Sequence, residues 1–399
     1  MTLPLAGVRI LAVEQYGAGP WASMYLSDLG AEVIKIEDPG TGDFSRASGP
    51  HFLGSADSLF FQTFNLGKKS VALDIRRPAG AAVLRQLATT ADAVLNNLRG
   101  DMPDKLGLTH AALAPVNPRL VCAHLSGYGR SGPRAAWPAF DYLMQAEAGF
   151  MDLTGEPGAP PTRMGLSIVD YMTGVTCALA LTAALYGALK TGQGRDVDVS
   201  LYDVAIHQLS YPATWYLNQN DAVQRRPRAG HPAVVPCETF PTADGQIFIM
   251  CVLPKFWEAL CTLTGLPDLP ADPRFATPQA RFDHRDTLAA ILDGALKAHP
   301  TARWMALFAG RVPAAPVLSL PEALDNPYLA AVGGIAAPGH PLRPDMRTLA
   351  SPIRLDGQRA VARPGPTLGA DTGAVLEQAG FDAAARAALA ADGIIGGQW

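Results

Sequence analysis

Short apolar runs alternate with helical segments through the first half of the chain, and this alternation restricts the fold more than any other feature of the sequence. Five such runs are rich in Val, Ile, Leu and Ala, at residues 8–14, 31–37, 69–75, 91–97 and 119–126. They are typical of strands that are buried on both faces. Helical segments separate some of them, at 19–30 and 79–90. Because strands that alternate with helices form βαβ units, the sequence predicts an α/β fold with a parallel sheet.

The sequence changes character near residue 225, which predicts a second domain. A basic, Pro-rich stretch precedes two strand-like runs around "TADG", a pattern that favours a hairpin, and helical segments follow at 255–265 and 286–299. We therefore expect a linker over 201–225 and a smaller α+β domain over 226–325. The tail after 326 carries an Ala-rich helical segment at 382–393, and its place in the fold stays open at this point.

Composition excludes several classes of protein. With 36 acidic against 32 basic side chains, the net charge of −4 provides no basic face for a nucleic acid. The cysteines show no C-x-x-C spacing, which suggests neither a zinc site nor a redox motif, and we expect a cytoplasmic protein with free thiols. They are Cys122, Cys177, Cys237, Cys251 and Cys261. Isolated histidines, and the absence of G-x-S-x-G and G-x-x-x-x-G-K-[ST], argue against metal catalysis, serine hydrolysis and ATP-driven ligation.

One carboxylate, Asp170, precedes nineteen uncharged residues, Tyr171 to Leu189, in the stretch "MGLSIVDYMTGVTCALALTAALYGALK". This run is long enough to cross a bilayer, but it is rich in Ala, Thr and Gly and has no second span beside it. We interpret it as a helix buried on all sides in a core or at a subunit interface, with no membrane partner. A strand-like segment follows at 194–203. Asp170 is then either a helix N-cap or a nucleophile.

A glycine motif follows the first strand. Gly17-x-Gly19-x-x-Ala22 opens a helix, and Glu37 ends the next strand, which approaches the dinucleotide-binding fingerprint. A tight turn with nothing bound is the alternative. The second motif, "GYGRSG", is followed by prolines rather than by a helix, and we interpret it as a connecting or active-site loop. The first motif supports a nucleotide-like ligand, and an NAD(P)-dependent oxidoreductase is one hypothesis that it leaves open.

Several segments together resemble the class III CoA-transferase family, which includes formyl-CoA transferases and α-methylacyl-CoA racemases. They occur in the family's order, at 7–46, 64–75, 96–108, 120–133, 140–155, 165–174 and 230–248. The resemblance implies a large Rossmann-like domain built from residues 1–200 and from the returning 326–399, with the smaller domain between them. It also implies an interlocked homodimer of two threaded chains.

Asp170 falls on the catalytic aspartate of that family. An acyl-CoA thioester is already activated, so transfer of its CoA to another carboxylate needs neither ATP nor a metal. It needs a carboxylate nucleophile, which forms a mixed anhydride and then an aspartyl-CoA thioester. We expect the helix N-terminus to favour the ionised form of Asp170. Coenzyme A thioester is thus expected as a substrate, with no permanently bound cofactor and no metal.

The resemblance also implies binding residues. Those expected to line the acyl site are Gln15, Tyr16, Gly17 and Ala18, where an amide N–H serves the oxyanion. Those expected to contact CoA are Asn97, Leu98, Arg99 and Lys105, with Lys68 and Lys69 as further phosphate ligands. Asp141 matches an acid near the site, and a structural role for it is an equal alternative. Gly230 and His231 match a loop that closes over the intermediates, although this loop has fewer glycines here than in formyl-CoA transferases.

Phe140 occupies the position of the racemases' histidine and cannot carry a proton, so the sequence favours CoA transfer over racemisation. The expected acceptor is a small carboxylic or dicarboxylic acid, and transfer within one dicarboxylyl-CoA is also open. The second carboxylate needs a cation, for which the candidates are Arg46, Arg163 and Arg228. Racemisation or isomerisation, the oxidoreductase and a non-catalytic CoA-binding protein are the remaining alternatives.

Overall fold

A parallel sheet organises the first of two units in the computed structural model, which describes residues 2–399. This unit comprises the chain up to residue 148, Gly165–Leu209 and Tyr328–Trp399, and the second comprises Gly149–Met164 and Ser210–Pro327. The strands of the sheet lie in the order β3 (Lys69–Ala72), β2 (Glu32–Glu37), β1 (Arg9–Val13), β4 (Ala93–Asn96), β5 (Val121–Ser126) and β6 (Arg195–Ser200). Every neighbouring pair is parallel, which confirms the predicted α/β fold.

The order of the strands determines where a ligand can enter. From β1 the chain winds outward to β2 and β3 on one side, and β4, β5 and β6 follow on the other side. The carboxyl ends of β1 and β4 therefore flank the point where the winding reverses, and such switch points form crevices in open α/β sheets. The loop after β1 begins at Glu14 and the loop after β4 begins at Asn97, so both loops meet there.

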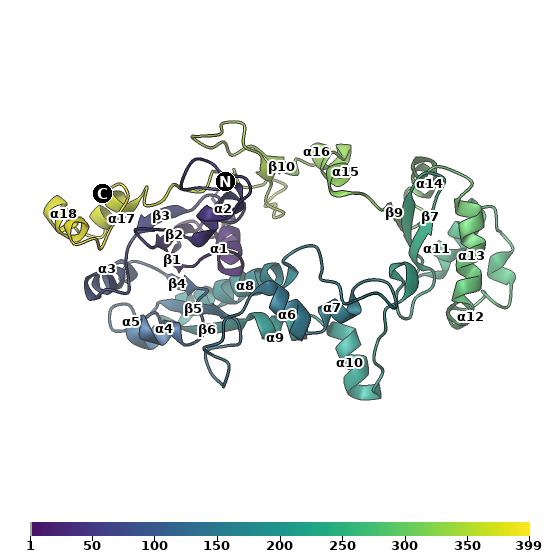
Figure 1. Cartoon of the computed structure of the whole chain (residues 1–399), viewed down its shortest axis with the longest axis horizontal. Helices are drawn as coiled ribbons and strands as arrows, with labels where there is room; N and C mark the ends of the chain where they lie inside the picture. The colour runs from purple at the N-terminus through teal and green to yellow at the C-terminus, as the bar shows by residue number, and fades with distance from the viewer. Residues whose placement is uncertain (1) are drawn as a thin grey trace. The chain divides into compact units, whose positions relative to one another are not determined.

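Helices cover both faces of this sheet (Figure 1). The helices of the first unit are α1 (Ala18–Asp28), α2 (Leu59–Asn65), α3 (Pro78–Ala88), α4 (Met102–Lys105), α5 (His110–Leu113), α6 (Asp141–Glu147), α8 (Ile168–Thr191), α9 (Leu201–His207), α17 (Thr372–Gln378) and α18 (Ala383–Ala391), with the 3₁₀ turn η1 (Phe44–Ala47). The short strands β10 (Ile335–Ala336) and β11 (Thr348–Leu349) pair outside the sheet, and α16 (Pro327–Ala331) precedes them. Helices α1 and α8 cross closely at Gly174, where a Cβ atom would lie 2.8 Å from the carbonyl oxygen of Ala18.

Helix α8 contains the uncharged run, and only one of its faces is covered within the chain. Its buried residues include Val169, Thr173, Cys177 and Leu181. A second face is exposed by between 46% and 76% at Val175, Leu179, Tyr186 and Leu189. The interpretation of a helix buried on all sides is therefore wrong for the single chain. Among the described residues α8 is the one helix long and apolar enough to span a membrane, a test that core helices of soluble proteins also pass.

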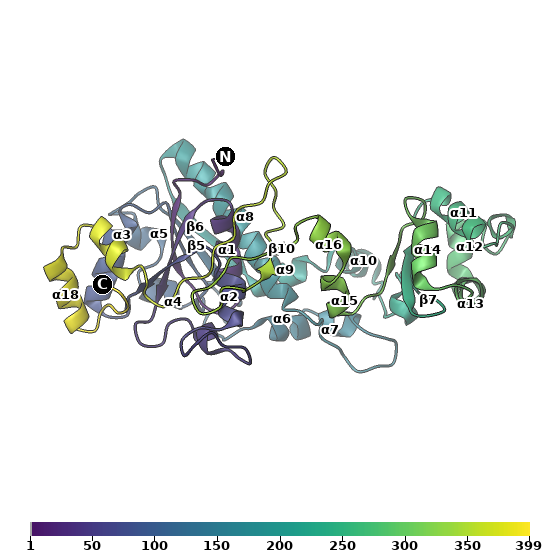
Figure 2. The same cartoon turned by 90° about the horizontal axis from the view of Figure 1, so that it is seen from above.

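The C-terminal segment covers the outer strand of the sheet. The carboxylate of Asp371 accepts a hydrogen bond from the Ser70 N–H at 2.9 Å, and the Thr372 hydroxyl accepts one from the Ala72 N–H at 3.0 Å. The Gly396 N–H donates to the Ala72 carbonyl at 3.1 Å. Figure 2 shows α18 beside α3 at this end of the sheet. Residues 371–396 thus supply partners that an edge strand otherwise lacks.

The second unit has a small antiparallel sheet in the order β7 (Cys237–Pro241), β8 (Gln246–Met250) and β9 (Ala314–Pro316). The β7–β8 pairing confirms the predicted hairpin. Its helices are α7 (Phe150–Leu153), α10 (Ser210–Gln219), α11 (Pro254–Leu263), α12 (Pro278–Asp283), α13 (Arg285–Leu296), α14 (Thr301–Phe308) and α15 (Leu320–Leu324), with 3₁₀ turns η2 (Pro227–Ala229) and η3 (Leu269–Ala271). Its core is separate from that of the first unit and includes Phe240, Trp257, Phe275, Leu292 and Phe308.

Candidate active site

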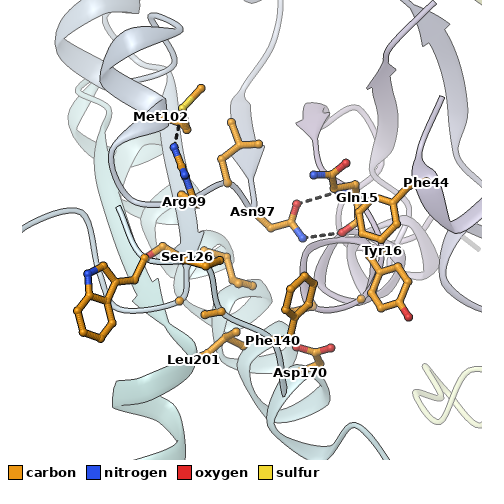
Figure 3. A pocket seen from close by; sticks show the side chains of 18 residues that line it. Gln15, Tyr16, Phe44, Asn97, Arg99, Met102, Ser126, Phe140, Asp170 and Leu201 are labelled. Carbon is orange, nitrogen blue, oxygen red and sulfur yellow. Dashed lines mark hydrogen bonds between the residues drawn. The ribbon is translucent and has the colours of Figure 1, made fainter. Parts of the chain in front are cut away.

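A cavity of about 420 Å³ lies in the first unit, at the carboxyl ends of β1, β4 and β5. Arg99 and Asp170 are the charged residues among those that line it. The other lining residues are Gln15, Tyr16, Gly17, Ala18, Phe44, Asn97, Leu98, Met102, Leu125, Ser126, Gly127, Trp137, Pro138, Ala139, Phe140 and Leu201. Figure 3 shows Arg99 and Asp170 on opposite sides of this space. An apolar cavity with few polar groups is typical of a small-molecule site.

Asp170 lies in the first turn of α8 but does not cap it, because the N-cap position belongs to Ser167. Its carboxylate lies against the loop that follows β1. A Cβ atom added to Gly17 would lie 2.5 Å from Asp170 Oδ2, so only glycine leaves room for this oxygen. The cavity therefore presents a carboxylate oxygen directly beside the main chain at Gly17.

Asp141 holds the first turn of α8 in place through a hydrogen bond. Its Oδ2 accepts a hydrogen bond from the Asp170 N–H at 3.0 Å. Its Oδ1 accepts one from Gln145 Nε2 at 2.6 Å, and Gln145 also donates to the Leu166 carbonyl at 3.0 Å. Both side chains are buried. The free N–H at this helix end is thus used by Asp141, which leaves the Asp170 carboxylate directed toward the cavity.

The pKa of Asp170 is raised to about 7, first by burial and then by the negative charge of Asp141. This outcome is opposite to the expected stabilisation of the ionised form by the helix end. The main physical reason is burial, which removes the water that would stabilise the charge of Asp170. In addition, the Asp170 N–H at the helix end binds Asp141, whose negative charge raises the pKa of Asp170 further. A carboxylate with a raised pKa is more basic, and its ionised form is a stronger nucleophile.

The loop after β1 is held by two side chains from other parts of the unit. Asn97 Oδ1 accepts a hydrogen bond from the Gln15 N–H at 2.9 Å, and Asn97 Nδ2 donates to the Gln15 carbonyl at 2.7 Å (Figure 3). Asp43 Oδ1 accepts from the Tyr16 N–H at 3.1 Å. Tyr16 itself has φ of 69°, a left-handed conformation that a non-glycine residue adopts only under constraint.

Buried charges lie behind this loop. Lys35 Nζ contacts Asp43 Oδ2 at 2.8 Å, and Lys68 Nζ contacts Glu14 Oε1 at 2.7 Å. Burial lowers the pKa of Lys68 to about 8. All four side chains are excluded from solvent, so Lys68 stabilises Glu14 rather than reaching a phosphate as we had considered. Such a network is costly to break because each lost partner leaves a buried charge unpaired.

Glu37 and the two glycines have structural roles that overturn the dinucleotide interpretation. Glu37 receives two hydrogen bonds from Arg46, at 2.7 and 2.8 Å, and is buried. This pair also removes Arg46 from the candidate cations for a substrate carboxylate. A Cβ at Gly19 would lie 2.7 Å from the Asn97 side chain, as one at Gly17 would meet Asp170. Both glycines thus make room for protein groups rather than for a pyrophosphate.

A second cavity of about 240 Å³ adjoins the first and shares Gln15, Leu98 and Met102 with it. Its other lining residues are Val13, Glu14, Ile36, Glu37, Asp38, Gly42, Asp43, Leu73, Asp74, Ile75, Arg76 and Leu106. It lies at the carboxyl ends of β1, β2 and β3, so the two cavities together cross the switch point of the sheet. Its walls combine apolar side chains with the carboxylates of Glu14, Glu37, Asp38, Asp43 and Asp74. Arg76 is the one cation among its lining residues, and it pairs with Asp38 at 2.5 Å and with Asp74 at 2.7 Å.

The remaining predicted residues lie elsewhere. Lys69 begins β3 at the opposite edge of the sheet and pairs with Glu32 at 2.6 Å, so it reaches neither of these two cavities. Lys105 ends α4 and pairs with Asp101 at 2.5 Å. Those in the second unit are Gly230, His231, Arg163 and Arg228. There the His231 ring accepts the Ala233 and Val234 N–H groups at 3.0 Å, Arg163 donates to the Met164 carbonyl at 3.0 Å, and Arg228 pairs with Asp293.

Other residues of the site carried no recognisable signal in the sequence. Trp137 lines the first cavity from an irregular segment and Phe44 from the 3₁₀ turn η1, and neither segment has a periodicity that marks an inward-facing residue. Phe44 stacks on Tyr16 with ring centroids 4.7 Å apart. Asp43 is the residue that holds Tyr16, but 27 positions separate the two in the chain. The family resemblance indicated Asp141, whereas Gln145, which donates to it from the same helix, was not singled out in the sequence.

Comparison with known proteins agrees with this geometry. The chain matches the model of CoA-transferase family III over residues 5–372. It is 34% identical to the succinate–glutarate CoA-transferase of Agrobacterium fabrum over 94% of this chain and 95% of that protein. It is 35% identical to the acetyl-CoA:oxalate CoA-transferase of Acetobacter aceti, over 85% and 89% respectively. A CAIB/BAIF family protein from Brucella suis has a similar structure, with a TM-score of 0.82 at 32% identity over 95% of this chain and 100% of that one. The chain belongs to CoA-transferase family III.

Proposed function

We propose that this enzyme moves coenzyme A from an acyl-CoA to a small carboxylic or dicarboxylic acid, with Asp170 as the nucleophile. The observation that carries the proposal is the Asp170 carboxylate, which lines an apolar cavity and contacts the Gly17 main chain. Relatives named for succinate, glutarate and oxalate support a short acid as acceptor.

The reaction is balanced without an external reagent. The ionised Asp170 attacks the thioester carbonyl, the C–S bond breaks, and a mixed anhydride and CoA thiolate form. The thiolate then attacks the aspartyl carbonyl, which releases the donor acid and leaves an aspartyl-CoA thioester. The acceptor carboxylate attacks that thioester, forms a second anhydride and frees the thiolate again. Attack of the thiolate on the acceptor's carbonyl yields the new acyl-CoA and restores Asp170.

The loop after β1 supports a particular oxyanion site. The Gln15 and Tyr16 N–H groups are used by Asn97 and Asp43. Gly17 and Ala18 open α1, where the first N–H groups of a helix have no partner within the helix. We therefore assign the developing oxyanion to these N–H groups, beside Asp170.

We place the nucleotide part of CoA in the second cavity, with its pantetheine arm running through the first toward Asp170. Arg99 lines the first cavity and is half-exposed, which suits a phosphate contact. Leu98 and Met102 line both cavities and suit the apolar stretch between them. Lys105 stays a predicted ligand, and so does the loop at Gly230 and His231 as a cover of the intermediates.

A homodimer completes the proposal. The exposed residues Val175, Leu179, Tyr186 and Leu189 are spaced by four, seven and three positions, which are whole helical turns, so they form one apolar stripe along α8. A stripe with this spacing suits a helix that packs against another chain. The interlocked arrangement implied by the sequence stays part of this proposal.

The decisive experiment is a screen of acyl-CoA donors against organic acids, with products identified by mass spectrometry. Each dicarboxylyl-CoA is also incubated alone, which detects transfer within one molecule. Asp170→Ala should abolish turnover, and hydroxylamine should label Asp170 only when acyl-CoA is present. Asp345→Ala, in which the replaced carboxylate is 83% exposed at the surface, serves as the matched control. Turnover that persists in Asp170→Ala rejects the assignment.

A further inference from the structure

We propose that Asn97 acts as a positioning residue for the Gln15–Gly17 loop rather than as a ligand of CoA. The inference rests on the proposed function, because the loop is assigned there to the reacting carbonyl. Asn97 was expected to contact CoA, and the structure gives its polar atoms a different use. Both ends of its carboxamide are bonded to the main chain of Gln15.

The clamp is reciprocal. Asn97 Oδ1 accepts the Gln15 N–H at 2.9 Å while Asn97 Nδ2 donates to the Gln15 carbonyl at 2.7 Å. The side-chain amide thus pairs with Gln15 as a neighbouring strand would, one residue beyond the end of β4. The first turn of α1 holds the amide in place, since a Cβ at Gly19 would lie 2.7 Å from Asn97 Cγ. This contact leaves the carboxamide little freedom to turn toward a ligand.

The loop needs such a clamp because its conformation is strained. Tyr16 follows Gln15 with φ of 69°, and Gly17 then lies against Asp170 Oδ2. Asp43 fixes the Tyr16 N–H, but Asn97 alone among the contacts described above fixes both polar groups of Gln15. Release of Gln15 lets the strained turn relax, which moves the N–H groups at Gly17 and Ala18 away from the reacting carbonyl. Misplacement by about 1 Å lowers a rate by about a hundredfold.

A carboxyl group at this position gives a test that depends on proton position. In Asn97→Asp, the ionised side chain has no donor for the Gln15 carbonyl and repels it. The protonated side chain has one acceptor and one donor, as the amide has, and restores both hydrogen bonds. The activity of this variant relative to the wild type should therefore recover as the pH falls. The ratio removes the separate effect of Asp170 protonation, which both enzymes share.

The experiment compares Asn97→Asp and Asn97→Ala with the full-length wild type between pH 5.5 and 8.5. At pH 8 both variants should lose about tenfold to a hundredfold in kcat, with KM for acyl-CoA changed less than about threefold. Because an aspartic acid has an ordinary pKa of about 3.9, only about 2% of the Asn97→Asp side chains are protonated at pH 5.5. The Asn97→Asp ratio should therefore rise by about threefold at most toward pH 5.5, while the Asn97→Ala ratio stays flat. Arg99→Gln provides the contrast of a CoA contact and should mainly raise KM.

Asn117→Asp is the matched control. Asn117 Nδ2 also donates to main-chain carbonyls, those of Ala88 at 3.0 Å and Ala91 at 2.8 Å, and it lies outside both cavities. It should show no recovery of relative kcat at low pH. The proposal is overturned if Asn97→Ala weakens CoA binding in calorimetry with kcat retained, or if it changes neither. A wild type without turnover rejects the proposed function instead, and CoA affinity of Asn97→Ala still decides whether Asn97 is a ligand.

Discussion

Gly17→Ala should separate the stability of the fold from the chemistry of the site. The added Cβ atom would lie 2.5 Å from Asp170 Oδ2. Nonbonded heavy atoms attract at about 3.5 Å or more, so one of the two groups must move by roughly 1 Å. The carboxylate is the end of a side chain beside a cavity, and it is the group that yields. The fold therefore tolerates the substitution while the nucleophile leaves its attacking position.

A displacement of about 1 Å from the reacting geometry lowers a rate about a hundredfold. We expect Gly17→Ala to lose about that factor in kcat, and in the single-turnover rate of aspartyl labelling by hydroxylamine, with a melting temperature close to that of the wild type. Gly187→Ala is the matched control, because a Cβ there meets nothing within 4 Å. A Gly17→Ala enzyme with kcat within about threefold of the wild type refutes the contact between loop and nucleophile.

Three further predictions follow from the same contacts. The value of kcat/KM should rise as Asp170 ionises near pH 7. Asp141→Asn should lower the pH at the midpoint of this rise, but the midpoint should stay above the pKa of a free aspartate because Asp170 remains buried. An unchanged midpoint in the kcat/KM–pH profile contradicts the role of Asp141. Arg46→Ala leaves the buried Glu37 carboxylate unpaired and should cost about 3–5 kcal/mol in urea unfolding, and a loss below about 1 kcal/mol is inconsistent with the buried pair. Leu179→Glu places a charge in the stripe on α8. Because interlocked chains separate only on unfolding, it should lower the melting temperature of the dimer, and an unchanged melting temperature rules out this face as the interface.

The regular elements were predictable because local patterns encode them. The apolar runs at 8–14 and 119–126 became β1 and β5 within two residues at each end, since strands buried on both faces leave no polar alternation to confuse the pattern. The uncharged run became α8, and Asp170 took its first turn. The sequence did not indicate that one face of this helix is exposed in the single chain. An all-apolar helix has the same residue pattern whether it packs against its own chain or against a second chain.

The charged residues were much harder to assign. Glu37 fits the dinucleotide-binding fingerprint by its spacing, but it pairs with Arg46, nine residues further along. Lys68 and Lys69 are adjacent in sequence, yet one is buried against Glu14 and the other lies near the surface at the edge of the sheet. The spacing of residues along the chain predicts the position of a residue on its strand or helix. The partner of its side chain depends on which loops the sheet brings together. Lys69 is an example: the sequence suggested it as a phosphate ligand of CoA, but its side chain pairs with Glu32 and lines neither cavity.

The closure of β3 by the C-terminal segment has a consequence for how the protein is made. A ribosome releases the first six strands long before residues 371–396 emerge, so the nascent sheet waits with an open border at Ser70 and Ala72. That border can pair with any passing strand of similar character. Early termination of translation should therefore yield insoluble material rather than a smaller working enzyme, because residues 371–396 complete the edge at β3 only after the rest of the sheet has been made.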